Sequence, residues 1–281
     1  MPTIAVMSPG AMGSAIGARL VQHGARVVTS LAGRSDASIA RARRANMVDA
    51  PLADLAAADI ILSIVPPQSA QAMAQAFAGA FASRSDAGSG AHAPLYVDCN
   101  ACSPATKAAI ADIVAGGGAR MIDACIIGGP DDEGGPNVYA AGPHAPDARL
   151  LATLGLRWHE LDAAIGAAAA LKMCFAGINK GLFALGNMMR LAAAEAGVGA
   201  ALTHELQARL PHVLDQLARG TPTIFPRAWR WAPEMREIAA FGADQSGAGD
   251  VFEGFARFYE RLASDLAGEQ KDFRTLSDAG G

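Results

Sequence analysis

The residue best suited to acid–base chemistry is Lys172, which lies within a long apolar stretch. This stretch, residues 161–196, has no proline and is dominated by alanine, leucine and methionine, which are strong helix formers. An ammonium group in such surroundings is costly unless it is paired, exposed in a cleft, or used. Burial also lowers the pKa of an ammonium toward neutrality, where the group can donate and accept a proton. We therefore predict that Lys172 is a general acid/base, the alternative being a solvated helix lysine.

A second group of residues is suited to binding the phosphates of a dinucleotide. It is the turn Ser8-Pro9-Gly10-Ala11-Met12-Gly13, which follows the β-branched apolar run 3–7 and precedes a segment with helical periodicity, 14–24. Backbone N–H groups at a helix start, together with the helix dipole, favour a pyrophosphate at such a turn. Ser8 takes the place of the first glycine of the G-x-G-x-x-G pattern, and an ordinary strand–helix turn is the alternative.

The loop after the next expected strand, residues 25–31, indicates which nicotinamide cofactor binds. NAD-preferring proteins carry an acidic residue at the end of this strand, where it binds the ribose 2′-OH. No Asp or Glu occurs from Met1 to Ser35, and the loop instead contains Arg34 and Ser35. A cation beside a hydroxyl suits the 2′-phosphate of NADP. We predict NADP, with NAD less favoured; a plain surface arginine is the alternative.

The elements that must position these groups alternate between strands and helices up to about residue 160. Apolar runs typical of buried strands occur at 59–65, 95–98, 120–127 and 137–141, helical segments at 37–46 and 69–81, and a polar loop at 83–93. Ser103 is expected to cap a helix that Pro104 opens. The alternation predicts an α/β fold with an open, mostly parallel, Rossmann-type sheet. Val65 and Pro66, where one strand ends, and Asn100, just after the next, join the candidate cofactor site.

After residue 161 the strand pattern stops, and Ala-, Leu- and Met-rich segments continue to residue 267, with breaks expected near 197–198, 220–226 and 242–249. We predict a Rossmann-type domain at 1–160 and an all-helical domain at 161–281 that begins with a long interdomain helix, with Lys172 facing the cleft between them. An unbroken helix over 161–196 would span roughly 50 Å. Because that exceeds what one small helical domain can cover, we expect a homodimer.

Composition narrows the class of protein. The net charge of −4 and the pI near 5.9 argue against a nucleic-acid partner, which would require a basic face. Charges that recur along residues 161–196 argue against a membrane span, and the absence of a signal-peptide pattern predicts a cytoplasmic protein.

Cys99 and Cys102 form a CxxC, but no second Cys or His pair follows. We interpret them as small buried or cleft-lining thiols rather than a zinc or redox site, and predict no metal.

Four segments, taken in order, resemble the β-hydroxyacid dehydrogenase superfamily, which includes 6-phosphogluconate and 3-hydroxyisobutyrate dehydrogenases. The glycine turn resembles the family's G-x-G-x-M-G, and residues 123–129 resemble its D-A-P-V-S-G-G segment. Residues 166–176, around Lys172, resemble its G-x-G-x-x-x-K-x-x-x-N helix, and residues 230–240 resemble a helical segment of one bacterial branch. Residues 98–104 occupy the place of a polar loop near the nicotinamide. The resemblance covers nearly the whole chain and implies hydride transfer with the lysine as acid/base and dimerisation through the helical domain.

The resemblance also implies a substrate site, and here the chain departs from the family. The candidate residues are Ile127, Gly128, Gly129, Ala176 and Asn179. Ile127 replaces the family's pocket serine and Ala176 its asparagine, while Ser8 and Ala168 replace glycines. Asn179, seven residues after Lys172, points the same way but lies roughly 10 Å further along the axis. Two apolar replacements predict a substrate with an alkyl or aryl group beside its carbonyl.

Three functions follow from these features. The first is an NADP-dependent dehydrogenase or reductase acting on an alcohol or carbonyl, with or without decarboxylation. The second is an imine reductase-like enzyme, against which stands Lys172, because relatives of that kind usually carry Asp or Tyr at this position. The third is a non-catalytic NADP-binding protein, which the altered substrate site keeps open.

Overall fold

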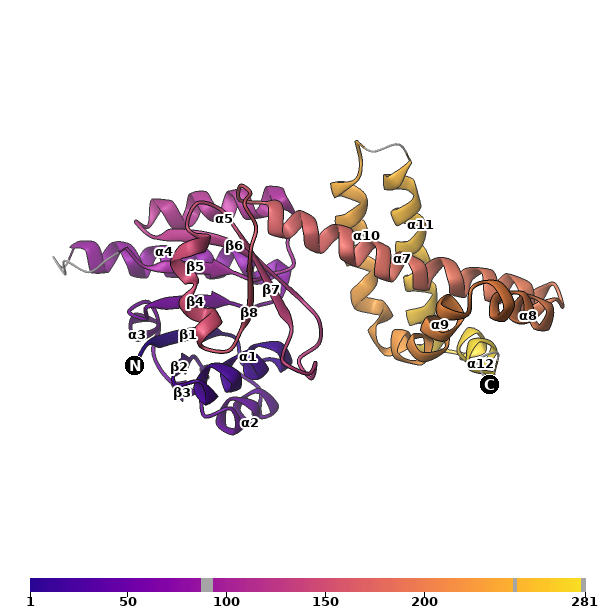
Figure 1. Ribbon diagram of the computed structural model, residues 1–281, viewed down its shortest axis with the longest axis horizontal. Coiled ribbons are helices and arrows are strands. Elements are labelled where there is room, and N and C mark those ends of the chain that lie inside the picture. Colours follow the sequence, from indigo (N-terminus) through magenta and orange to yellow (C-terminus); the bar gives the residue numbers. More distant parts are fainter. Residues whose placement is uncertain (87–92, 245–246, 279–281) are drawn as a thin grey trace. The chain divides into compact units, whose positions relative to one another are not determined.

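The chain folds into two compact units, residues 1–172 and 173–281, in a computed structural model that describes residues 1–86, 93–244 and 247–278 (Figure 1). The first unit is α/β and the second is helical. The sequence placed the boundary at 160/161, where the strand pattern stops. The compact units instead divide at Lys172, so the first residues of the long helix belong to the α/β unit.

An eight-stranded sheet forms the centre of the first unit, in the order β3-β2-β1-β4-β5-β6-β7-β8. The strands are β1 (Thr3–Met7), β2 (Arg26–Thr29), β3 (Val48–Asp49), β4 (Ile60–Ser63), β5 (Leu95–Asp98), β6 (Arg120–Ile127), β7 (Asn137–Ala141) and β8 (Arg157–Glu160). All neighbours are parallel except β6 and β7. The predicted Rossmann-type, mostly parallel sheet is confirmed, and β3 and β8 are additions that the sequence analysis did not predict.

Helices cover both faces of this sheet. They are α1 (Ala11–Gln22), α2 (Asp36–Arg44), α3 (Leu52–Leu55), α4 (Ala70–Asp86), α5 (Pro104–Gly116) and α6 (Leu150–Thr153). One face packs Ile4, Val6 and Leu62 against residues of α1 and α2; the other packs Ala5, Met7 and Ile61 against α4 and α5. This alternation follows from the two-residue period of a strand. The expected loop at 83–93 begins later, because α4 continues to Asp86, and residues 87–92 lie outside the described part of the chain.

Ser103 caps α5 as predicted, its hydroxyl accepting the Thr106 N–H at 3.2 Å. The long helix, α7 (Ala167–Glu195), begins later than expected. Its start is delayed because the Leu161 N–H donates to the Ala140 carbonyl at 2.7 Å and Gly166 adopts a φ of +101° before the helix begins. That positive φ is accessible to glycine at no steric cost.

The helical unit contains most of α7, then α8 (Gly199–Arg209), α9 (Pro211–Ile224), α10 (Ala228–Phe241), α11 (Ala248–Ala267) and α12 (Lys271–Asp278). The break expected at 220–226 falls at the end of that range: α9 continues through Gly220 and Pro222 to Ile224, and a 3-10 turn, η3 (Phe225–Arg227), then leads into α10. Gly220 lies against α7: a Cβ there would be 2.2 Å from the Phe183 ring. A further break, which the sequence analysis did not predict, lies before Pro211, which opens α9.

The core of the helical unit forms around one side of α7, where Met173, Ala176 and Ala184 are buried with residues of α9, α10 and α11. By length and composition α7 is, among the described residues, the one helix apolar enough to cross a membrane. The core helix of a soluble protein passes the same test, and 44% of the apolar window of α7 is buried inside the fold.

Candidate functional site

The glycine turn joins β1 to α1 and leaves backbone N–H groups at the helix start. Gly10 is the N-cap residue, no acidic residue occupies the first turn, and the Ser14 hydroxyl donates to the Gly10 carbonyl at 2.7 Å. A Cβ at Gly13 would lie 2.0 Å from the Ser8 carbonyl oxygen, whereas a Cβ at Gly10 would meet nothing within 4 Å. Gly13 therefore lets the turn close on itself, while Gly10 leaves open space. Open space at a helix N-terminus without acidic residues fits the pyrophosphate of a dinucleotide.

The loop after β2 brings together more polar groups than the sequence suggested. Ser35 caps α2 by accepting the Ser38 N–H, and Arg41 donates to the Ser38 hydroxyl at 2.9 Å and to the Pro9 carbonyl at 3.3 Å. Arg41 thus links this loop to the glycine turn. The sequence analysis missed it because it lies six residues beyond Ser35, and only the packing of α2 brings it back to Pro9. Arg34 has no side-chain hydrogen bond or ion pair within the described residues.

A carboxylate does lie near the end of β2, although none precedes Ser35 in the sequence. It is Asp49 of β3, which is paired with Thr29 and accepts the Leu31 N–H at 2.9 Å. The sequence analysis missed Asp49 because β3 has only two residues and shows no apolar run. Its oxygen Oδ1 is used by the backbone of the loop.

Asn100 is buried, with 2% of its surface exposed, and holds together the ends of β4 and β5. Its Oδ1 accepts the Val65 N–H at 2.6 Å, and its Nδ2 donates to Asp98 at 2.8 Å and Ser63 at 3.0 Å. The side chain is therefore fully engaged and holds Val65, just beyond the end of β4, to the end of β5. Pro66 itself is exposed.

Lys172 is the sixth residue of α7, and its Nζ donates to the Ile126 carbonyl at 2.8 Å. The side chain is half-buried rather than enclosed. An ammonium has three donors, so this bond fixes its place at the carboxyl end of β6 and leaves two donors for a substrate. No other partner of Lys172 occurs within the described residues.

The candidate substrate residues of the α/β unit lie at the same strand end. Ile127 is half-buried and packs in an apolar cluster with Cys125, Tyr139 and Leu171. The Asp132 carboxylate lies over the glycine pair: it accepts the Gly129 N–H at 2.9 Å, and a Cβ at Gly128 would come within 2.4 Å of it. The sequence analysis did not single out Asp132, which belongs to an exposed acidic run, residues 131–133.

The two other candidate substrate residues lie in the helical unit. Ala176 is buried in the core of that unit. Asn179 accepts a hydrogen bond from Gln216 of α9 at 3.4 Å. A role for Ala176 and Asn179 in substrate binding stays a prediction.

The cysteines are free thiols, of which Cys99, Cys102 and Cys125 are buried and Cys174 is exposed. Burial raises the pKa of Cys125 to about 11, although the nearby Lys172 charge lowers it. Burial likewise raises the pKa of Cys99. A thiol with a raised pKa is a poor nucleophile, so Cys99 and Cys125 are poorly suited to that role, and Cys99 and Cys102 are buried as interpreted from the sequence.

Beneath Lys172 lies a buried ionic cluster that the sequence analysis did not find. Lys107 of α5 contacts Asp98 Oδ1 at 2.5 Å and Asp123 Oδ1 at 3.3 Å, and all three side chains are fully buried. Burial alone would lower the pKa of Lys107, but the two carboxylates together raise it above its ordinary value. The sequence signal was weak, because a lysine on a helix is usually exposed.

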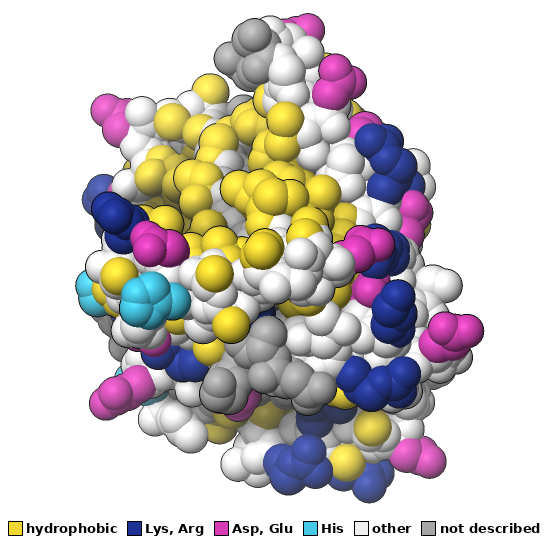
Figure 2. Space-filling model, turned by 90° about the vertical axis from the view of Figure 1, so that its right-hand side faces the viewer, with side chains coloured by type: hydrophobic (Ala, Val, Ile, Leu, Met, Phe, Trp, Pro, Cys, Tyr) yellow, Lys and Arg dark blue, Asp and Glu magenta, His cyan; other side chains and the backbone are white. Residues whose placement is uncertain are grey.

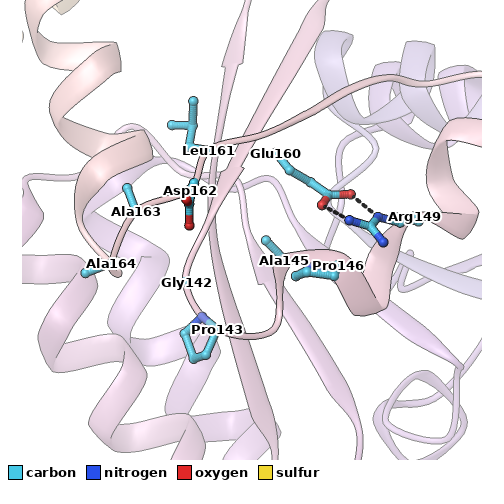
Figure 3. Close-up of a pocket in the computed structure, with 10 residues that line it drawn as sticks. All are labelled: Gly142, Pro143, Ala145, Pro146, Arg149, Glu160, Leu161, Asp162, Ala163 and Ala164. Carbon is cyan, nitrogen blue, oxygen red and sulfur yellow. Dashed lines mark hydrogen bonds and ion pairs between the residues drawn. The ribbon is translucent and has the colours of Figure 1, made fainter.

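The α/β unit also has a surface hollow (Figure 3), one of whose lining residues, Leu161, packs in the same apolar cluster as Ile127. The hollow is lined by the segments that follow β7 and β8, and a bidentate pair between Arg149 and Glu160 borders it. The end of β7, Ala141, pairs with Asp123, whereas Ile127 pairs with Asn137 at the start of β7. We assign no function to this hollow.

The geometry defines a class of protein: a nucleotide-binding α/β fold with a lysine at the carboxyl edge of its sheet. Comparison with family models agrees. Residues 3–150 match the NAD binding domain of 6-phosphogluconate dehydrogenase, and residues 193–262 match a domain of unknown function, DUF1932. The chain belongs to the β-hydroxyacid dehydrogenase superfamily and has the NAD(P)-binding fold of dehydrogenases and reductases. No curated protein matches its sequence.

Solved structures similar to this chain cover nearly its whole length. A conserved hypothetical protein from Sinorhizobium meliloti has 21% identity, covering 99% of this chain and 97% of its own, with a TM-score of 0.73. Mycobacterium tuberculosis 3-hydroxyisobutyrate dehydrogenase, solved with L-serine, has 18% identity, coverage of 98% and 99%, and a TM-score of 0.69. An imine reductase from Myxococcus stipitatus, in complex with NADP+, has 17% identity, coverage of 99% for both, and a TM-score of 0.60. At such identities the likeness establishes the fold.

The two glycines of the turn predict different outcomes when each is replaced by alanine. Gly10→Ala should leave the thermal unfolding temperature within about 2 °C, because the added Cβ has space, but should weaken NADPH binding at least tenfold by filling the phosphate site. Gly13→Ala should lower the unfolding temperature by several degrees, because the Ser8 carbonyl must move. Fluorescence titration and calorimetry measure both. Undiminished NADPH affinity in Gly10→Ala would place the phosphates elsewhere.

Proposed function

We propose that this protein is an NADP-dependent oxidoreductase that transfers hydride between the nicotinamide and a carbonyl or alcohol, with Lys172 as the general acid/base. The observation that carries the proposal is the Lys172 ammonium fixed on the Ile126 carbonyl, beside the glycine pair at the carboxyl edge of the sheet. In open α/β folds, ligands bind outside the carboxyl ends of the strands. Membership of a dehydrogenase superfamily supports the same reaction class.

The residues of the glycine turn, Ser8 to Gly13, would hold the pyrophosphate, and Arg34 and Ser35 the 2′-phosphate, with Arg41 behind them. When bound, the cofactor supplies or takes the hydride. Lys172 donates a proton to the carbonyl oxygen in reduction and accepts it from the hydroxyl in oxidation. Its bond to Ile126 holds the ammonium in place, so that little ordering is required when the substrate enters.

Replacement of the acid/base residue tests the role of Lys172. Lys172→Met should retain the fold and the NADPH affinity but lower kcat by about two to four orders of magnitude, the usual contribution of a positioned acid/base. The matched control is Lys180→Met, which removes another α7 lysine, one paired with Glu234. A Lys172→Met enzyme with near-normal kcat would show that the lysine is structural.

Cofactor preference tests the role assigned to the loop after β2. NADPH should bind at least tenfold more tightly than NADH, because an arginine contact with the 2′-phosphate is worth about 2–3 kcal/mol. Arg34→Ala should remove most of that difference and Arg41→Ala part of it, while Arg44→Ala, at the exposed end of α2, should not. If the wild type bound NADPH and NADH with equal affinity, the predicted preference for NADP would be contradicted, and Asp49 would become the candidate ligand of the ribose.

The substrate class follows from Ile127 and Asp132. An apolar side chain packed with Tyr139 and Leu171 favours an alkyl or aryl group, at roughly 25 cal/mol per Å² buried. The Asp132 carboxylate over Gly128 and Gly129 occupies a backbone donor and repels a substrate carboxylate. Both features disfavour small hydroxyacids and favour neutral carbonyl compounds.

Comparison of kcat/KM for 3-hydroxyisobutyrate, 6-phosphogluconate and a series of bulkier aldehydes and ketones tests this preference. The bulkier carbonyl compounds should be the better substrates. Asp132→Asn should raise kcat/KM for the small acids about three- to tenfold, because it removes one charge, and should leave neutral substrates unchanged. Efficient wild-type turnover of either acid, above about 10⁴ M⁻¹s⁻¹, would refute the proposed specificity.

Imine reduction is the second candidate function, because the acidic run at 131–133 would attract an iminium cation and imine reductases share the fold. Including cyclic imines in the same substrate panel separates the two activities. An absence of NADPH oxidation with every class, together with tight NADPH binding, would leave the non-catalytic alternative.

We also propose a homodimer formed through α7. Within the helical unit, this helix exposes Phe175 (46%), Ile178 (76%), Leu185 (52%) and Met189 (50%) along one side. Figure 2 shows hydrophobic side chains gathered on the side of the chain that is turned toward the viewer. Apolar areas of this kind mark interaction sites, and the resemblance to dimeric relatives supports a second copy as the partner.

Sedimentation velocity tests the dimer. The wild type should sediment as a dimer at micromolar concentration, and Ile178→Asp should shift it to monomer, because an aspartate cannot be buried unpaired in an interface. Leu150→Asp, at an exposed leucine of α6, is the control and should stay dimeric. A wild type that is monomeric at all concentrations would refute the proposal.

A further inference from the structure

The buried cluster beneath Lys172 is built from three elements of the α/β unit. Asp98, the last residue of β5, pairs in register with Asp123 of β6, and Lys107 of α5 lies between the two carboxylates. The Lys107 Nζ contacts Asp98 Oδ1 at 2.5 Å and donates to the Asp98 carbonyl at 2.6 Å and the Ala124 carbonyl at 3.0 Å. Asp123 Oδ1 lies 3.3 Å away. Lys107 therefore joins both strands at one point.

Two carboxylates and one ammonium leave the cluster with a net charge of −1, which backbone and amide donors offset. Asp123 Oδ2 accepts three N–H groups at the start of α7, from Gly166 at 2.9 Å, Ala168 at 3.0 Å and Ala169 at 3.3 Å. Asp98 accepts the backbone N–H of Asn100 at 3.1 Å and its Nδ2 at 2.8 Å. A helix start carries about half a positive charge, so the carboxylate and α7 stabilise each other.

The two ends of the cluster lead to two parts of the candidate site. Asp123 accepts the Ala169 N–H, and α7 reaches Lys172 three residues later. Along β6, Ile126 follows Asp123 by three residues, and its carbonyl accepts the hydrogen bond from the Lys172 ammonium. From Asp98, Asn100 leads to the Val65 N–H at the candidate cofactor site. Helix and strand are thus fixed at Asp123 before they meet again at Lys172.

We propose that Lys107 and Asp123 are positioning residues for Lys172: their ion pair anchors the first turn of α7 on β6 and so sets where the Lys172 ammonium lies. The inference rests on the proposed function for its catalytic consequence, but not for the placement itself. Stability alone does not call for such a cluster, because apolar residues of similar volume often replace a buried ion pair at no cost in stability. An error of about 1 Å in the place of a catalytic group lowers rates by as much as 100-fold.

The variant that tests the proposal is Lys107→Met/Asp123→Leu. It keeps the net charge of the cluster at −1, leaves Asp98 and Asn100 in place, and removes the acceptor of the three α7 N–H groups. The companion variant Lys107→Met/Asp123→Asn keeps one oxygen for those N–H groups and is close to isosteric, so it remains informative where the first variant fails to fold. Lys180→Met, further along the same helix, is the control.

Lysine NMR provides a readout that does not depend on activity. The chain has four lysines, Lys107, Lys172, Lys180 and Lys271, so protein labelled with ¹³C at lysine Cε gives four resolvable signals, assigned by single substitutions. In the wild type the Lys172 signal should differ from that of exposed Lys271. In the leucine variant the Lys172 chemical shift should move at least halfway toward that of Lys271. In the asparagine variant it should move less, and in Lys180→Met it should not move.

Kinetics then connect placement to chemistry. The leucine variant should lose at least tenfold in kcat while its KM and NADPH Kd stay within threefold, with partial recovery of kcat in the asparagine variant. An unmoved Lys172 signal in both variants would overturn the proposal, and so would a moved signal with kcat retained within threefold. If the wild type turns over no substrate, the proposed function fails, whereas the NMR result still decides whether the cluster places Lys172.

Discussion

One carboxylate oxygen, Oδ2 of Asp123, accepts three backbone N–H groups at the start of α7. A helix start has four such groups without partners inside the helix, and here a strand side chain satisfies most of them in a fully buried place. The same carboxylate balances Lys107, which in turn balances Asp98. The relation of the sheet to the helix that carries Lys172, and the position of Val65, both depend on this set of contacts.

Much of the α/β unit could be predicted from the sequence because its signals are local. The apolar run before the glycine turn, the Ser103 cap and the continuous runs of β4 and β6 each need only a few neighbouring residues. Two-residue β3 and the polar β8 have no such signal and form because the sheet offers them an edge. The start of α7 was misplaced because residues 161–166, which composition alone assigns to the helix, instead follow β7 through backbone hydrogen bonds such as Leu161 N–H to the Ala140 carbonyl.

The candidate site likewise has features that the sequence predicts and features that only the fold shows. Lys172 and the glycine turn stand out by residue type and spacing, whereas the partner of Lys172 is a backbone carbonyl, which leaves no trace in the sequence. The roles of three other residues can be seen only in the folded chain. Arg41 donates to the Pro9 carbonyl, Asp49 accepts the Leu31 N–H, and Asp132 accepts the Gly129 N–H. Lys107 is the extreme case: a lysine on a helix is usually exposed, and nothing in the sequence shows that Asp98 and Asp123 flank it.

The composition of the buried cluster has an evolutionary consequence. Loss of Lys107 alone would leave two buried acids without their cation, loss of Asp123 would leave three N–H groups without an acceptor, and loss of Asp98 would remove the nearer carboxylate of the ammonium. Each single substitution therefore passes through an unfavourable intermediate, while joint replacement by apolar residues does not. Among descendants of a common ancestor, these three positions should be inherited as a block, either all retained or all exchanged, even where the surface around them has diverged freely.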